Sequence, residues 1–543
     1  MRRLAASLLI LGLVVPVAQG QPAFWQKQAR QLAPLPNIVS NQVQELAPAG
    51  DSLWSGPLLT VYLEPNDRTN PADSLLIADV PALTEGDNAV FSIEAQPVSA
   101  TRSLVWAGLA FDTGGNVPGA GGFLVSTDGG ESFNERPTQL DAPSDTIIQY
   151  GSSSLPAAAI TQQADSAPQD LAFGPKGDTV WVAGVRSGIR WTADQGTTWT
   201  RTVLPPDTSQ TIDPTTPTNV FVGPPPRGNE AGPGSLNHVG FSVLVDETGT
   251  VWAGTAKGLN RSRPEDLRTN GDRAWRRFGV ADSANTPPGE FVVALAEQPR
   301  TGRRNSIWMA TWAGQQEQQG RLQRFGVAVT PDGGNTFRQT LLGERISDIA
   351  AREDRVYAAG DRGLFVSNDR GRTWRSLQDF PVQNDNTVLP TDVTPQALAL
   401  TDVALWVGTS DGLLRLDRTE ESRLLTGSPE WQLFRAETPV NPENPSEEVP
   451  DVSTYAYPNP FVPSRDQLVR IAYELPAPRT VTVTIYDFAM NRVRTITEQK
   501  PDGQQETTWD GTDDQGLRVP TGTYFYRVDL GTKTVQGKIL VAN

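Results

Sequence analysis

The sequence predicts an all-β fold, with a seven-bladed β-propeller followed by a small C-terminal Ig-like β-sandwich. Three observations predict it: an aromatic string that recurs seven times, a polar octapeptide that recurs four times, and a tail of alternating strands and turns. Repetition at about 50 residues with β-type alternation is typical of propellers, in which each repeat forms one four-stranded sheet. We expect the propeller over residues 21–436, a Pro- and Glu-rich linker over 437–452 and the sandwich over 453–543.

The N-terminal stretch MRRLAASLLILGLVVPVAQG (1–20) is typical of a secretory signal peptide. Arg2 and Arg3 form a basic n-region, an apolar stretch follows, and Ala18-Gln19-Gly20 supplies a small-x-small cleavage site. The apolar stretch is short for a membrane span, and no later segment has the apolar character of one. We therefore expect an exported mature chain that is extracellular or at the cell surface, without a transmembrane span after signal cleavage.

The aromatic string combines an apolar pair, a Trp, a small residue and Gly, as in VWAGTAKGLN (251–260) and LWVGTSDGLL (405–414). Its seven aromatics lie 49 to 75 residues apart: Trp54, Trp106, Trp181, Trp252, Trp308, Tyr357 and Trp406. An apolar strand comes before the string, for example VFSIEA (90–95) and FSVLVD (241–246). We expect this strand to be the innermost of its blade and the aromatic string to be the second.

The polar octapeptide has the pattern S-x-D-x-G-x-T-W and is expected to join the third strand of a blade to its outer fourth strand. Its hydroxyl and carboxylate can bond the amides of the turn itself, while Gly takes the positive φ that the reversal needs. The terminal aromatic is expected to pack between strands or blades. The matching residues are Ser126, Asp128, Gly130 and Phe133; Thr192, Asp194, Gly196 and Trp199; Thr330, Asp332, Gly334 and Phe337; and Ser367, Asp369, Gly371 and Trp374. Blade four keeps only a stretched remnant from Ser262 to Trp275.

This octapeptide resembles the Asp-box of sialidases, sortilin ectodomains and related propellers. The resemblance implies a propeller fold, and for the aspartates we expect a structural role. A sialidase would also need a Tyr nucleophile with a Glu partner and an Arg-Ile-Pro-like motif, which is absent here. We therefore expect no catalytic residue and no enzyme, with a secreted glycoside hydrolase built on a sialidase-like propeller as one alternative. With so many acidic residues, the paired-carboxylate route of glycosidases also stays open.

The amino-acid composition limits the partners and metal sites that the chain can have. Acidic residues outnumber basic ones 62 to 46, giving a net charge of −16, which disfavours a nucleic-acid partner. The chain has no cysteine and one histidine, His238, so Cys-type and two-His metal sites are excluded and we expect no metal and no cofactor. We expect His238 to be a lone surface or turn histidine, and DGTDD (510–514) to be a plain β-turn and not a calcium loop.

In the tail, outward and inward residue types alternate in VTVTIYDF (481–488) and TYFYRVDL (523–530), and residues typical of turns lie between these segments. This pattern predicts a small antiparallel sandwich. Its motifs are Tyr457-Pro458-Asn459-Pro460-Phe461, Trp509-Asp510-Gly511 and Gly522-Thr523-Tyr524-Phe525-Tyr526. With these motifs the tail resembles the C-terminal sorting domain of type IX secretion cargo and the flagellar hook-capping Ig-like domain. The resemblance implies export from a Bacteroidetes-type bacterium, with the outer-membrane secretion machinery as a partner.

Five long insertions indicate where a ligand would bind. Residues 134–167, 201–238 and 377–395 join successive blades, and 110–121 and 312–322 join second to third strands. All five fall on the face opposite the octapeptides, and long loops on a rigid scaffold are where binding usually resides. We predict a non-catalytic binding or interaction scaffold for a glycan or a protein, with an extracytoplasmic sensor propeller as a further alternative.

Two segments could supply the outer strand that completes the last blade. FWQKQARQL (24–32) and EWQLFRA (430–436) both have the pattern of an orphan outer strand. The sequence alone does not choose between them.

Overall fold

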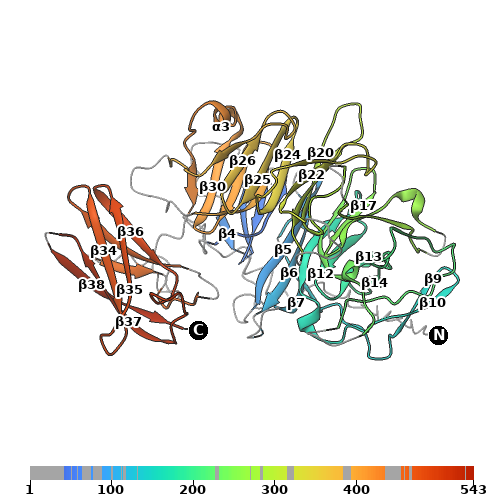
Figure 1. Ribbon diagram of the computed structural model, residues 1–543, viewed down its shortest axis with the longest axis horizontal. Coiled ribbons are helices and arrows are strands. Elements are labelled where there is room, and N and C mark those ends of the chain that lie inside the picture. The colour runs from blue at the N-terminus through green and yellow to red at the C-terminus, as the bar shows by residue number, and fades with distance from the viewer. Residues whose placement is uncertain are drawn as a thin grey trace, which may run out of the picture.

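The structure, a computed structural model, describes residues 42–434 and 454–542 except 51, 58, 64–74, 78–87, 100–101, 112, 114–117, 131, 227–231, 269–270, 282–284, 315–322, 383–392, 458, 464–467 and 532. The expected signal peptide, the candidate strand 24–32 and the linker 437–452 therefore lie outside the described residues. Apart from short helical turns, the regular structure consists of β-strands, in a large body and a smaller C-terminal one (Figure 1).

Seven antiparallel sheets of consecutive strands follow one another through the described residues from 46 to 434. The first strand of each sheet contacts the first strand of the next, and β28 of the seventh sheet contacts β1 of the first, so the sheets form a closed ring. The first two sheets contain β1 (Leu46–Ala49), β2 (Ser52–Ser55), β3 (Thr60–Leu63) and β4 (Leu75–Ile77), then β5 (Asn88–Ser99), β6 (Arg102–Phe111), β7 (Gly119–Ser126) and β8 (Asn134–Arg136).

The next two sheets contain β11 (Pro168–Phe173), β12 (Val180–Gly184), β13 (Gly188–Thr192) and β14 (Thr200–Arg201), then β16 (Gly240–Val245), β17 (Val251–Thr255), β18 (Gly258–Ser262) and β19 (Trp275–Phe278). The last three contain β20 (Phe291–Gln298), β21 (Ser306–Trp312), β22 (Gly326–Thr330) and β23 (Arg338–Thr340); β24 (Ile346–Arg352), β25 (Arg355–Gly360), β26 (Gly363–Ser367) and β27 (Arg375–Leu377); and β28 (Pro395–Leu400), β29 (Ala404–Thr409), β30 (Gly412–Asp417) and β31 (Gln432–Phe434). Short helical turns are η4 (Pro264–Asp266), η5 (Arg418–Glu420) and α3 (Arg423–Thr426).

The recurring aromatic lies in the second strand of its sheet in each of these seven sheets. The open question of the last outer strand is also decided. Phe434 of β31 pairs with Leu413 of β30, so the segment 430–436 supplies the fourth strand of the seventh sheet.

Aromatic contacts join one blade to the next around the ring. Ring centroids lie 6.1 to 6.4 Å apart in edge-on geometry in four pairs: Trp54 with Phe133, Trp106 with Trp199, Trp181 with Trp275, and Trp308 with Trp374. Trp252 shares a buried cluster with Phe278 and Phe337. Tyr62 of the first blade packs 4.6 Å from Trp406 of the seventh, which closes the circle. Such pairs stabilise a fold beyond the apolar area that they bury.

Two insertions build an ordered rim on the third and fourth blades. They contain β9 (Ile147–Tyr150), β10 (Ser153–Pro156), η2 (Gln163–Asp165), β15 (Thr211–Ile212) and η3 (Leu236–His238). β15 pairs with β19 as a fifth, outermost strand of the fourth sheet. The β9–β10 hairpin lies at the edge of the ring farthest from the C-terminal body (Figure 1).

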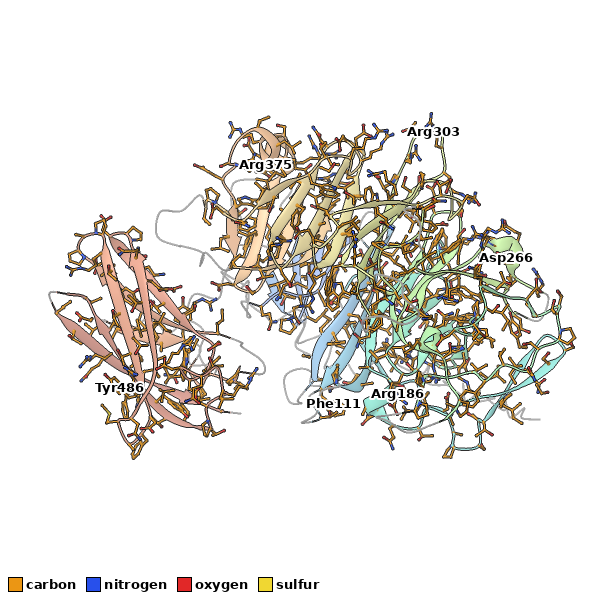
Figure 2. The ribbon with its side chains drawn as sticks, viewed as in Figure 1. Phe111, Arg186, Asp266, Arg303, Arg375 and Tyr486 are labelled. Carbon is orange, nitrogen blue, oxygen red and sulfur yellow. The ribbon has the colours of Figure 1, made fainter. Side chains whose placement is uncertain are left out.

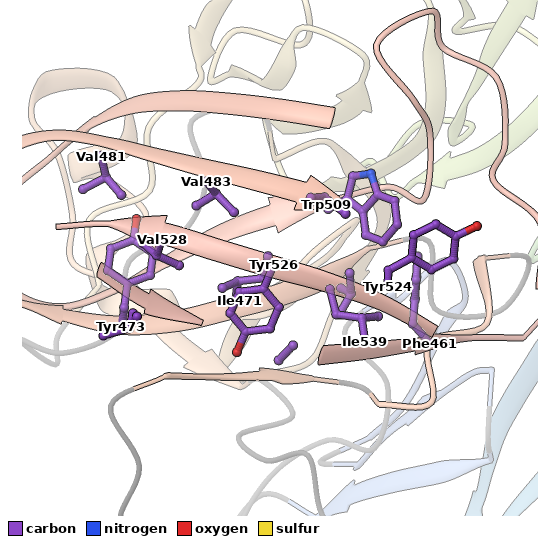
Figure 3. Close-up of a cluster of buried hydrophobic side chains, with 14 of the residues drawn as sticks. Phe461, Ile471, Tyr473, Val481, Val483, Trp509, Tyr524, Tyr526, Val528 and Ile539 are labelled. Carbon is purple, nitrogen blue, oxygen red and sulfur yellow. The ribbon is translucent and has the colours of Figure 1, made fainter. Parts of the chain in front are cut away.

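The C-terminal body is a sandwich of two sheets. One contains β32 (Thr454–Tyr457), β33 (Val469–Leu475) and β36 (Gly503–Trp509), and the other contains β35 (Arg492–Lys500), β34 (Arg479–Tyr486), β37 (Gly522–Asp529) and β38 (Thr534–Val541). Alternate residues of both sheets, among them Ile471, Val483 and Tyr526, meet in one core (Figure 3). The predicted fold class, an all-β propeller-like ring followed by a C-terminal Ig-like sandwich, is confirmed.

Replacing Trp374 tests the contacts between blades. Trp374→Ala should lower the free energy of unfolding by about 3 kcal/mol, because it removes the ring that packs on Trp308 and leaves a cavity. It also removes the hydrogen bond that Trp374 Nε1 donates to Thr340 Oγ1 over 2.7 Å. Urea denaturation followed by circular dichroism measures the change, and Trp374→Phe, which keeps an aromatic ring, should lose less. A loss below about 0.5 kcal/mol, the size of an ordinary surface substitution, would contradict the packing role.

Candidate functional site

The four octapeptides form the same self-bonded turn between the third and fourth strands of their blades. In the turn after β26, Ser367 Oγ donates to Asp369 Oδ1 over 2.8 Å and accepts from Gly371 N over 2.8 Å. Thr373 donates to the same carboxylate through its amide, over 2.9 Å, and its hydroxyl, over 2.6 Å. Gly371 has φ +70°, and a Cβ there would collide with the Trp308 ring of the preceding blade.

These bonds account for the octapeptide aspartates without a ligand. In the turn after β13, hydrogen bonds from Thr198 and Thr192 lower the pKa of Asp194 to about 2. The carboxylate is therefore ionised and bonded within its own turn. The turns at 126–133, 192–199, 330–337 and 367–374 sit on four different blades, so they do not meet at one point.

The tail motifs lie in the core and hydrogen-bond scaffold of the sandwich. Phe461 is fully buried, 6.2 Å from Trp509, and Trp509 lies 5.5 Å from Tyr524 (Figure 3). Asn459 Oδ1 accepts a hydrogen bond from Leu540 N over 2.8 Å, which fastens the motif to β38. Pro458 lies outside the described residues. The segment 510–514 forms turns in which aspartates accept nearby backbone amides, as expected for DGTDD.

His238 lies in the turn η3 but is buried, so the expected surface position is wrong. Burial lowers the pKa of His238 to about 4, although nearby Asp207 acts in the opposite direction. The imidazole is therefore neutral at physiological pH and is shielded from solvent.

The two longest insertions do not stand as free loops over one face. Tyr150, Leu155 and Val222 join a buried cluster with Trp181 of the third blade. The Tyr150 hydroxyl donates to the Arg273 carbonyl, over 2.8 Å, in the connection that lies on the octapeptide face. The described parts of 134–167 and 201–238 thus wrap the rim of the third and fourth blades.

Four carboxylates that the sequence analysis did not single out lie in or directly before the innermost strands, and we call them the axial cluster. Glu45 comes directly before β1, Glu94 lies in β5, Asp170 in β11 and Asp348 in β24; each keeps part of its surface exposed. They are electrostatically coupled: Asp170 raises the pKa of Glu45 and of Glu94, and Asp348 raises that of Asp170.

A β-bulge positions two members of this cluster. The register shifts between Pro168 and Asp170, and between Ile346 and Asp348. Asp170 then accepts the amide of Val243 in the next blade over 2.8 Å, as Asp348 accepts that of Leu398 over 2.7 Å. Because inner strands begin at the connections between blades, these bulges lie near the face that carries the long insertions.

Burial dominates the ionisation of the axial cluster. It raises the pKa of Glu94 to about 8 and that of Asp348 to about 6. It raises that of Asp170 to about 7, although two backbone hydrogen bonds act in the opposite direction. The pKa of Glu45 is also raised, well above its ordinary value. Glu94 therefore keeps its proton at neutral pH while Asp348 is mostly ionised, and each added negative charge meets others close by.

Partly exposed aromatic side chains lie at the same end of neighbouring blades. Phe241, at the bulge of β16, and Phe291, the first residue of β20, have ring centroids 5.5 Å apart. Trp312 pairs with Phe291 at the end of β21, and the Arg345 guanidinium stacks 4.1 Å above its ring. This aromatic group and the axial cluster together form the candidate binding site.

No metal site accompanies these groups. Within the described ranges, no set of three or more Asp, Glu or His side chains is arranged to hold a metal ion. In the same part of the chain, no helix has the length and apolar character needed to cross a bilayer.

The C-terminal domain matches a family of known proteins. Residues 464–533 match the FlgD Ig-like domain family. No curated protein matches the chain. This match covers only residues of the sandwich and none of the ring.

Solved structures with β-propeller folds are similar to the chain. The GH74 xyloglucanase of Xanthomonas campestris is 12% identical, with 93% of this chain and 74% of that chain covered and a TM-score of 0.50. PorZ, an essential surface component of the type IX secretion system of Porphyromonas gingivalis, is 15% identical, with 92% and 81% covered and a TM-score of 0.31. YCF48 bound to a D1 peptide is 15% identical, with 70% and 93% covered and a TM-score of 0.39. At these identities the likeness concerns the fold alone.

Replacing Glu94 tests the coupling in the axial cluster. Because folding raises the pKa of Glu94 from 4.5 to about 8, its contribution to stability is greatest below pH 4.5 and is lost as pH rises toward 8. Glu94→Gln should therefore leave the free energy of unfolding unchanged near pH 4.5 and raise it at pH 8. The expected rise is about 2 kcal/mol, because partial exposure to solvent reduces the electrostatic cost of the charge.

Urea denaturation at a series of pH values measures this effect. Glu430→Gln, at an exposed position, is the matched control and should not alter the pH profile. If the profiles of Glu94→Gln and the parent chain are parallel from pH 4.5 to 8, the axial carboxylate is not protonated as proposed.

Proposed function

We propose that this protein is an exported propeller that works as a non-catalytic binding module, at the cell surface or in the medium, with a C-terminal sandwich that serves export. One observation carries the binding role: partly exposed aromatics at the ends of β16, β20 and β21, and the carboxylates at the bulges of β11 and β24, all lie toward the connections between blades. The octapeptide turns offer no comparable arrangement, since their carboxylates bond within the turn.

The chemistry of the candidate site limits what it can bind. Phe241, Phe291 and Trp312 provide apolar faces that can pack on a sugar ring or an apolar side chain. The axial carboxylates accept hydrogen bonds from hydroxyl groups and, when ionised, attract amino groups. A glycan or a protein segment rich in hydroxyl or amino groups is therefore the ligand class that fits, and an anionic polymer is disfavoured.

The export role is supported by the two ends of the chain. The N-terminal 20 residues have the pattern of a signal peptide, and the tail matches the FlgD Ig-like domain family over 464–533. The sandwich has its own core, distinct from the clusters of the ring. A domain with its own core can be recognised by secretion machinery without rearranging the propeller.

A secreted glycoside hydrolase is the second candidate, and one observation favours it. Glu94 and Asp170 are coupled and have pKa values of about 8 and about 7, the range in which a carboxyl group can act as a general acid. Release of reducing sugar from a polysaccharide panel, lost in Glu94→Gln, would decide for this candidate.

Binding at the axial site can be tested on glycan and cell-envelope arrays. Trp312→Ala should reduce the affinity of the strongest hit by about tenfold, the effect of one lost aromatic anchor. Leu267→Ala, an exposed apolar residue on the octapeptide face, is the control and should leave the affinity unchanged. Undiminished binding by Trp312→Ala and Phe291→Ala together would place the ligand elsewhere.

Removing the sandwich tests the export role. In a bacterium that has type IX secretion, a chain lacking residues 453–543 should fold as a propeller and stay in the periplasm. Immunoblots of periplasm, cell surface and medium measure the distribution, with the full chain as reference. Normal release of the shortened protein would end the export hypothesis.

A further inference from the structure

The sandwich has two outward sheet faces, and the propeller contacts one of them. Arg470 and Ala472 lie on the outward side of β33, yet both are buried. Arg470 also forms an ion pair with Asp411 in the turn between β29 and β30 of the propeller. On the second sheet, by contrast, the outward residues Arg527 and Lys538 are exposed. Figure 2 labels Tyr486 on this second sheet.

One row of side chains crosses the open face. The strand register pairs Arg492 with Tyr486, Tyr486 with Phe525, and Phe525 with Lys538. Cross-strand partners share one face of a sheet, and the next residue, Tyr526, belongs to the core, so the row points outward. Two aromatic rings are therefore flanked by two cations.

The turn after β34 adds apolar surface to this row. Phe488 is 78% exposed, and its ring lies 6.3 Å from that of Phe525. Met490 is 60% exposed and has φ +63°, a left-handed conformation that costs a residue with a Cβ about 1 kcal/mol. A turn that served only to reverse the chain would favour Gly or Asn there. Exposed apolar side chains held in a strained turn indicate a contact surface.

The charges of the open face indicate what kind of surface it meets. Neither Arg527 nor Lys538 forms an ion pair with a described residue, and Arg492 faces Asp514 across 3.6 Å in an exposed pair. Residues 454–543 contain ten Lys or Arg and ten Asp or Glu, so the net charge of −16 belongs to the rest of the chain. An aromatic face with exposed cations complements a partner that presents carboxylates beside apolar anchors.

We propose that Tyr486, Phe488, Arg492, Phe525 and Lys538, here called the outer aromatic face, form a docking surface for an acidic segment of a partner protein. Apolar side chains of that segment contact the three rings, and its carboxylates pair with the two cations. The proposal rests on the proposed export role, because that role requires a partner that recognises the sandwich.

Two synthetic peptides of equal length test the proposal on the full mature chain. In one, Leu and Phe alternate with Asp and Glu; in the other, Lys replaces each acidic residue. Fluorescence anisotropy of the labelled peptides should show that the acidic peptide binds about tenfold more tightly, with an affinity that falls as salt rises.

Variants of the outer aromatic face make the test specific. Arg492→Glu combined with Lys538→Glu should reverse the preference in favour of the basic peptide, and Phe525→Ser should weaken binding of the acidic one. Lys533→Glu reverses one charge in the turn between β37 and β38, as each of the two substitutions does on the face, and should leave both affinities unchanged. Thermal unfolding of each variant verifies that the sandwich is folded.

Several results would overturn the proposal. Equal binding of the two peptides, or a preference that the double charge reversal leaves unaltered, would remove its basis. Binding of phosphatidylglycerol vesicles without peptide binding would make this a lipid-facing surface, and self-association that depends on Phe525 would make the occupant a second copy. Normal release of a chain lacking 453–543 would end the export role instead, whatever the peptides show.

Discussion

Each blade of the ring is held to the next by an aromatic side chain of its second strand, which packs on a residue where the neighbouring blade passes from its third strand to its fourth. Trp308 with Trp374 and Trp106 with Trp199 show the arrangement, and Tyr62 with Trp406 closes it. Where the sixth blade carries Tyr357 in place of Trp, the hydroxyl donates to Glu421 of the seventh over 2.8 Å. The circle of blades is stable only if every junction between blades is filled. These contacts therefore require the octapeptide turn, and they require a glycine in it so that the aromatic side chain of the neighbouring blade can approach.

With the blades joined at the octapeptide face, the opposite face is free to carry other chemistry. There the inner strands bulge, and Asp170 and Asp348 bond amides of the next blade while adding charge near the axis. Burial raises the pKa of both carboxyl groups although these hydrogen bonds lower it, so charge and burial conflict at these positions. Such conflicts are expected where a surface is selected for function. The same end of the axis carries Phe241, Phe291 and Trp312, and this coincidence is the strongest structural support for a binding role.

The sandwich separates its family motifs from its open surface. Phe461, Trp509 and Tyr524 fill the core, so they specify the fold of the domain and have little surface to offer a partner. The residues that remain outside, Tyr486, Phe488 and Phe525, come from strand and turn positions whose outward orientation follows from the register. The motif that makes the domain recognisable in sequence and the surface available to a partner are therefore different sets of residues.

The sequence by itself determined the repeat, the strand order within a blade, the turn chemistry of the octapeptides and the presence of the C-terminal sandwich, because these depend on alternation, glycine and local hydrogen bonding. Only the tertiary structure showed that 430–436 completes the seventh sheet, that His238 is buried, and that the two longest insertions wrap the rim. It also brought Glu94 and Asp170 together from strands 76 residues apart in the chain. A single carboxylate in an apolar strand such as VFSIEA or PQDLAF was a local signal, but closure of the ring decides whether such carboxylates meet. Local patterns depend on residues that are neighbours in the chain. Charge coupling and burial depend on distances between blades, which are set only when the blades have formed a closed ring.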